Sequence, residues 1–106
     1  MKIVKPIVKG DIVARVTLYG TSPGGRHGPT PRDELRCMMV IDGETLDVRL
    51  YFHSERPLRP GQTAKIPIRF LFPDQAKKLV SVGKTFLLRE MNSIGEGVID
   101  QVIMTV

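Results

Sequence analysis

The chain has 106 residues, with 16 lysines and arginines against 11 aspartates and glutamates, which gives a net charge of +5. This length fits one domain, and no apolar stretch reaches the roughly 20 residues that a membrane helix needs. The single cysteine, Cys37, excludes an internal disulfide, and no apolar run typical of a signal peptide follows Met1. These features favour a reducing, cytoplasmic setting.

The positive charge is concentrated in the first third of the chain. Residues 1–36 contain seven basic and three acidic side chains, which account for most of the excess. A cluster of this kind favours an RNA partner, whose phosphates the basic side chains would contact. The alternative is that the charge serves solubility alone, because a net charge of this size is ordinary for a small soluble domain.

Apolar and polar residues alternate along several segments that are separated by glycines and prolines. Period two is typical of strands in a sheet with one face in water. The segments that we expect to be strands are 12–19, 36–41, 46–52, 64–72, 85–90 and 97–104. Asp42-Gly43 predicts a tight hairpin between the second and third strands, because glycine accepts a positive φ. Pro67 has no N–H, so we expect it at a sheet edge or a bulge.

Six strands with frequent turns predict an all-β fold. We expect a six-stranded antiparallel closed β-barrel, since closure removes exposed strand edges. The barrel would span residues 10–106, after a linker-like segment at 1–9. Residues 73–82 predict either one helical turn after Pro73 or an irregular crossover, and the alternation places Phe72 on the inner face. The positions expected inside the barrel are Val16, Leu18, Val48, Leu50, Ile66, Ile68, Phe86 and Leu88.

The chain contains no motif for catalysis or for nucleotide binding. The glycine and lysine spacing of a phosphate loop is missing. His27 and His53 have no partner at the spacing of a zinc site. Cys37 lies in an apolar strand segment, which favours a buried structural thiol over a nucleophile. We therefore expect neither an enzyme nor a protein that binds a metal, a nucleotide or another cofactor.

The loop at 21–32 is the strongest candidate site that the residues themselves indicate. Gly24 and Gly25 let the backbone turn tightly and expose N–H groups. Arg26 offers a planar fork suited to phosphate, and the neighbouring His27 can donate, accept or stack. The alternative is a purely structural turn, in which Arg26 is hydrogen-bonded to nearby carbonyl groups.

Four segments of the chain follow one another in a distinctive order. They are Gly-Gly-Arg-His-Gly-Pro at 24–29, Leu-Arg-Pro-Gly-Gln at 58–62, Thr-Phe-Leu-Leu-Arg-Glu at 85–90 and Ile-Gly-Glu-Gly-Val-Ile at 94–99. This series resembles the third, C-terminal domain of elongation factor Tu, and the resemblance covers nearly the whole chain. It implies a free-standing barrel of that type, without the GTPase machinery of the full factor.

The resemblance also implies a binding surface, because the matching loop of elongation factor Tu grips the backbone of aminoacyl-tRNA. The residues it assigns to RNA or partner binding are Gly24, Gly25, Arg26, His27, Arg32, Arg36, Gly95 and Gly97. Of these, Arg32 and Arg36 are the two candidates to replace a family arginine, and the two last glycines are expected in a neighbouring turn.

Two functions follow as expectations. The first is a non-catalytic binding module that contacts tRNA-like RNA or translation proteins. The second is a protein-interaction module that mimics the barrel and has lost RNA binding. The basic first third favours RNA, whereas Asp33 and Glu34 and the absence of the family's aromatic residues after the loop favour a protein partner.

Overall fold

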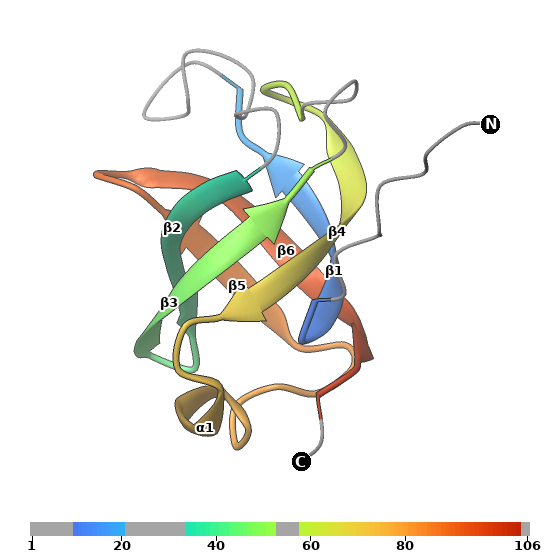
Figure 1. The fold of residues 1–106 in the computed structure, drawn as a ribbon. Helices are drawn as coiled ribbons and strands as arrows, with labels where there is room; N and C mark the ends of the chain where they lie inside the picture. The colour runs from blue at the N-terminus through green and yellow to red at the C-terminus, as the bar shows by residue number, and fades with distance from the viewer. Residues whose placement is uncertain (1–9, 21–33, 53–57, 105–106) are drawn as a thin grey trace, which may run out of the picture.

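A computed structural model of the protein describes residues 10–20, 34–52 and 58–104, in which six antiparallel strands close into a barrel (Figure 1). The strands are β1 Ile12–Leu18, β2 Glu34–Ile41, β3 Glu44–Tyr51, β4 Thr63–Phe70, β5 Thr85–Arg89 and β6 Ser93–Val102. Their order around the barrel is β1-β4-β3-β2-β5-β6, and β6 pairs back with β1. The predicted fold is confirmed. The linker-like segment expected at 1–9 lies outside the described residues.

The core fills the barrel as the alternation predicts. All eight positions expected inside are buried, with at most 5% of each side chain's surface exposed. Burial of each such side chain from water contributes about 1.5–3 kcal/mol. Alternation in the sequence therefore identified which face of each strand points inward.

Several strand ends differ from the sequence prediction by one to four residues. β2 begins at Glu34 and β6 at Ser93, both earlier than expected, and β4 ends at Phe70. Phe72, expected on the inner face, is 53% exposed. The prediction was wrong because the chain leaves the sheet at this point and turns at Pro73 into the helical turn α1, Pro73–Ala76. That turn settles the alternative left open for residues 73–82.

The tight turn predicted between β2 and β3 is confirmed. Asp42 and Gly43 have φ angles of 50° and 77°, and a tight hairpin turn with two positive φ angles matches the right-handed twist of its strands.

Pro67 pairs with Val13 of β1, and the β3–β4 ladder starts one residue later, at Ile68. The β3 side of Pro67 is thus unpaired, as its missing N–H requires, and β4 has a local edge at this position.

Within the described residues, no helix is long and apolar enough to cross a membrane.

Candidate functional site

Most of the site predicted from the sequence lies beyond the described residues. Gly24, Gly25, Arg26, His27 and Arg32 belong to this group, so their roles remain predictions. The structure does place the three other residues, two glycines in β6 and an arginine in β2.

Gly95 and Gly97 both lie within strand β6, and not in the neighbouring turn that the resemblance implies. The strand predicted at 97–104 already included Gly97. Both glycines are buried. A Cβ at position 95 would lie 2.5 Å from the Thr17 carbonyl oxygen, and one at position 97 would lie 2.3 Å from Phe86 Cζ. Close packing of β6 against β1 and β5 therefore explains both glycines. Any contact they make with a partner remains a prediction.

Arg36 belongs to a row of three arginines on the outer wall of the barrel. It lies opposite Arg49 in the β2–β3 ladder, and Arg49 lies opposite Arg69 in the β3–β4 ladder. The residues flanking each arginine along its strand are buried, so the arginines point outward. Neighbouring strands are about 4.8 Å apart. We call Arg36, Arg49 and Arg69 the arginine row.

Glu34 supplies negative charge to this row. Its carboxylate lies 3.6 Å from Arg49 Nε and 4.0 Å from Arg36 Nε. Arg49 also donates a 3.0 Å hydrogen bond from Nη1 to the Val48 carbonyl oxygen, and only 22% of its side chain is exposed, against 73% for Arg36. No described residue forms an ion pair with the exposed Arg69. The Glu34 carboxylate thus pairs with two of the three arginines.

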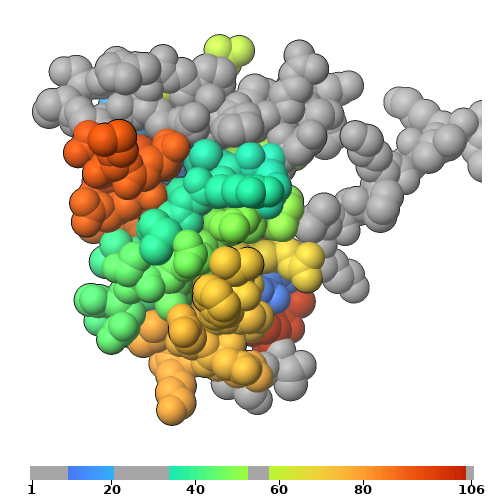
Figure 2. Space-filling model, turned by 60° about the vertical axis from the view of Figure 1, so that its left-hand side comes forward, coloured from blue at the N-terminus to red at the C-terminus, as the bar shows by residue number. Residues whose placement is uncertain are grey.

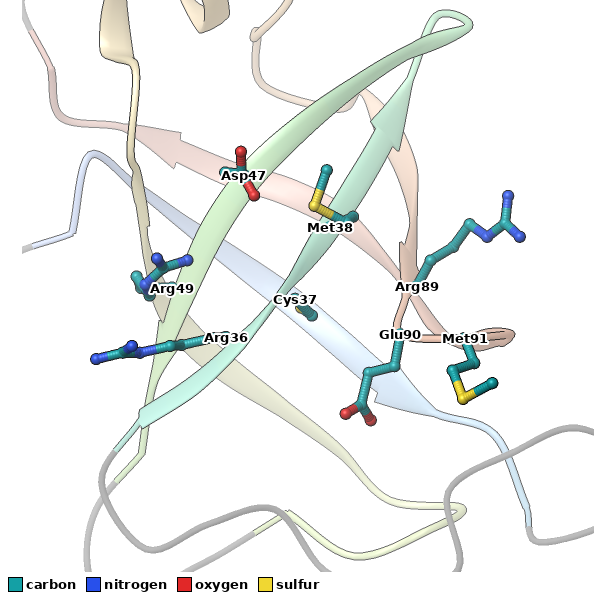
Figure 3. Close-up of a pocket in the computed structure, with 8 residues that line it drawn as sticks. All are labelled: Arg36, Cys37, Met38, Asp47, Arg49, Arg89, Glu90 and Met91. Carbon is teal, nitrogen blue, oxygen red and sulfur yellow. The ribbon is translucent and has the colours of Figure 1, made fainter.

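An open hollow of about 420 Å³ lies beside the arginine row. Its lining combines arginines, carboxylates and methionines; the residues are Arg36, Cys37, Met38, Asp47, Arg49, Arg89, Glu90 and Met91. Figure 3 shows the guanidinium groups of Arg36 and Arg49 on one side of the hollow and that of Arg89 on the other. Between these two positively charged sides lie Met38, Cys37 and the carboxylates of Asp47 and Glu90 (Figure 3).

The chemistry of this wall is that of ion binding. Arginine stays protonated at physiological pH, and its planar fork matches carboxylate and phosphate oxygens. Among the residues that the structure describes, no three His, Cys, Asp or Glu side chains come together as metal ligands. The arginines of this wall are thus the groups whose geometry would suit an anion.

Two members of the row, Arg49 and Arg69, were missed in the sequence analysis. Period two places both on the outer face, which the sequence does indicate. The two-residue turn at Asp42-Gly43 sets Arg36 opposite Arg49. The sequence does not indicate that Arg49 lies opposite Arg69, because the register of β3 and β4 depends on the assembled sheet.

Comparison with protein-family models found no match for the chain, and a search of curated proteins likewise found none. The function is therefore inferred from the charges and contacts of the described residues.

Proposed function

We propose that the chain is a non-catalytic β-barrel module that binds RNA through its phosphate backbone. The observation that carries this proposal is the arginine row, in which three cations lie on neighbouring strands and the Glu34 carboxylate pairs with only two of them. Like charges directly opposite one another destabilise a sheet, so the row is stabilised by a partner that brings negative charge. Guanidinium groups bind phosphate oxygens through paired N–H donors, which makes phosphate a fitting partner.

The RNA that we propose is tRNA-like, in the cytoplasmic setting of translation. The proposal of a tRNA-like RNA rests on the resemblance, in which the chain is a free-standing homologue of the third domain of elongation factor Tu. In that view, Arg26, His27 and Arg32 extend the contact surface that the arginine row begins. Arg36 supports the combination, because it belongs both to the residues that the resemblance assigns and to the row.

A protein-interaction module without RNA binding is the second candidate. The observation that favours it is the hollow, where Asp47 and Glu90 offset part of the arginine charge and Met91 is 91% exposed. A flexible methionine adapts to apolar surfaces of a protein partner. Purification from cell extract with and without RNase separates the two candidates, since only an RNA partner is lost on digestion.

A titration of tRNA at several salt concentrations tests the leading proposal. Arg69→Gln removes the member of the row that forms no ion pair with a described residue, and Lys78→Gln removes the same charge from an exposed position after α1. We expect Arg69→Gln to weaken binding at low salt roughly tenfold, or about 1.4 kcal/mol. The salt dependence should fall by about one counterion. Lys78→Gln should leave the tRNA affinity and its salt dependence nearly unchanged. Equal effects of the two variants, or no binding by the wild type at low salt, would overturn the proposal.

Glu34→Gln gives a test of opposite sign. Because Glu34 competes with phosphate for Arg36 and Arg49, its neutralisation should tighten tRNA binding. The same change loses two partly exposed ion pairs, so the free energy of unfolding should fall by no more than about 1 kcal/mol. Weaker tRNA binding by this variant would show that Glu34 positions the arginines instead of competing for them.

A further inference from the structure

Two apolar side chains lie exposed where β4 ends, close to the arginine row. Leu71 and Phe72 are 49% and 53% exposed, although Phe70 directly before them is buried. Figure 2 shows the end of β4 and the residues that follow it (yellow to gold) on the same face of the molecule as β3 (green). Single exposed apolar residues are ordinary. Leu71 and Phe72 are consecutive and follow closely after Arg69, which makes the end of β4 a candidate contact surface.

The backbone holds this segment in place. The Leu71 N–H donates a 3.0 Å hydrogen bond to the Asp47 carbonyl oxygen, which ties the chain to β3. The Gln75 N–H donates to the Phe72 carbonyl oxygen at 3.1 Å, at the start of α1. Phe72 is thus an exposed ring on a fixed backbone, three residues after Arg69. A group that is already ordered loses little conformational entropy when it binds a ligand.

We propose that an unpaired base of the RNA stacks on the ring of Phe72 while adjoining phosphates lie on the arginine row. The inference rests on the proposed function and specifies its ligand, namely RNA that is single-stranded at this wall. A positively charged surface combined with an aromatic ring is typical of single-strand binding, because every base has a face that can stack. Bases within a duplex are already stacked on their neighbours, so recognition by stacking requires unpaired bases.

The binding of a short oligouridine, compared with a duplex RNA of the same length, tests this selectivity. Phe72→Leu keeps an apolar side chain and removes the aromatic face. It should weaken oligouridine binding about fivefold to a hundredfold and leave duplex binding unchanged. Phe72→Tyr restores an aromatic face and should bind oligouridine like the wild type. Because position 72 is exposed, all three proteins should unfold at similar urea concentrations.

A fluorescent probe at the same position reports stacking directly. The chain contains no tryptophan, so Phe72→Trp introduces a single tryptophan on the proposed stacking surface, whose fluorescence can be excited selectively. Its emission should change saturably as oligouridine is added. Val98→Trp is the matched control, at a partly exposed position of β6 opposite Thr85 of β5, and its emission should not change.

The outcomes separate this inference from the function on which it rests. If Arg69→Gln weakens oligouridine binding but Phe72→Leu does not, and the tryptophan at position 72 gives no signal, the stacking inference is overturned and RNA binding stands. Duplex binding as tight as oligouridine binding, with equal sensitivity to Phe72→Leu, also overturns it. If the wild type binds neither RNA at low salt, both proposals fall.

Discussion

Replacement of Gly97 by alanine should destabilise the barrel through one identifiable contact. The added Cβ would lie 2.3 Å from Phe86 Cζ and 2.8 Å from Cε1. Carbon atoms pack at about 3.5–4.0 Å, so the ring must move by more than 1 Å within the core, where Phe86 is only 3% exposed. Overpacking of this kind costs about 1–3 kcal/mol, which exceeds the roughly 0.4–1 kcal/mol that alanine gains from a less flexible unfolded chain.

Urea unfolding of a double-mutant cycle measures the effect. Phe86→Leu alone removes part of the ring and should cost roughly 1–2 kcal/mol, less than the 3–5 kcal/mol of a change to alanine. In the double variant the smaller side chain makes room for the new methyl group. The two losses should therefore sum to more than the loss in the double variant, by about 0.5–3 kcal/mol. Gly20→Ala, at an exposed position with nothing within 4 Å, is the control and should change stability little.

Strict additivity in this cycle would refute the reasoning. So would a Gly97→Ala variant as stable as the wild type with an unchanged denaturant slope, since that slope reports the surface exposed on unfolding. Either result would show that β5 and β6 are not paired with Gly97 opposite Phe86.

Substitutions at two other positions and one ligand titration test separate features of the chain. Leu50→Ala removes a fully buried side chain and should cost about 2–5 kcal/mol in urea unfolding; a loss below about 1 kcal/mol would contradict the register of β3. Asp11→Ala leaves the Phe70 N–H without its 2.9 Å acceptor and should cost about 1–3 kcal/mol, whereas Asp11→Asn retains an acceptor and should cost less. Equal losses would point to the carboxylate charge. Calorimetry with GTP and GDP should show no saturable heat, because the chain has no phosphate loop; micromolar binding would contradict this.

Local sequence was sufficient wherever one strand or one turn decides the outcome. Alternation in β3 assigns Leu50 to the core and Arg49 to the outer wall without any knowledge of its neighbours, because successive side chains of a strand point to opposite faces. Asp42-Gly43 likewise predicts its hairpin, since the backbone conformation depends on those two residues. These parts of the fold could be derived from short segments of the chain.

Only the tertiary structure decided which segments meet. β1 lies between β4 and β6, and β5 lies beside β2, although long stretches of chain separate these strands. Their register results from closure of the whole barrel and not from any local pattern. The assembled sheet also brings Arg69 of β4 opposite Arg49, whereas the pairs Arg36–Arg49 and Phe86–Gly97 lie within the hairpins β2–β3 and β5–β6.

The end of β4 likewise depends on tertiary contacts and not on the local sequence pattern. Alternation carried through Phe72 would bury its ring, but the chain leaves the sheet after Phe70 and the ring stays in water. β4 ends where its ladder with β3 ends: the Leu71 N–H donates to the Asp47 carbonyl oxygen, next to the Val48–Phe70 pair, just before the chain turns at Pro73. The proposed stacking position therefore exists only because β4 leaves its antiparallel partner β3 at this point.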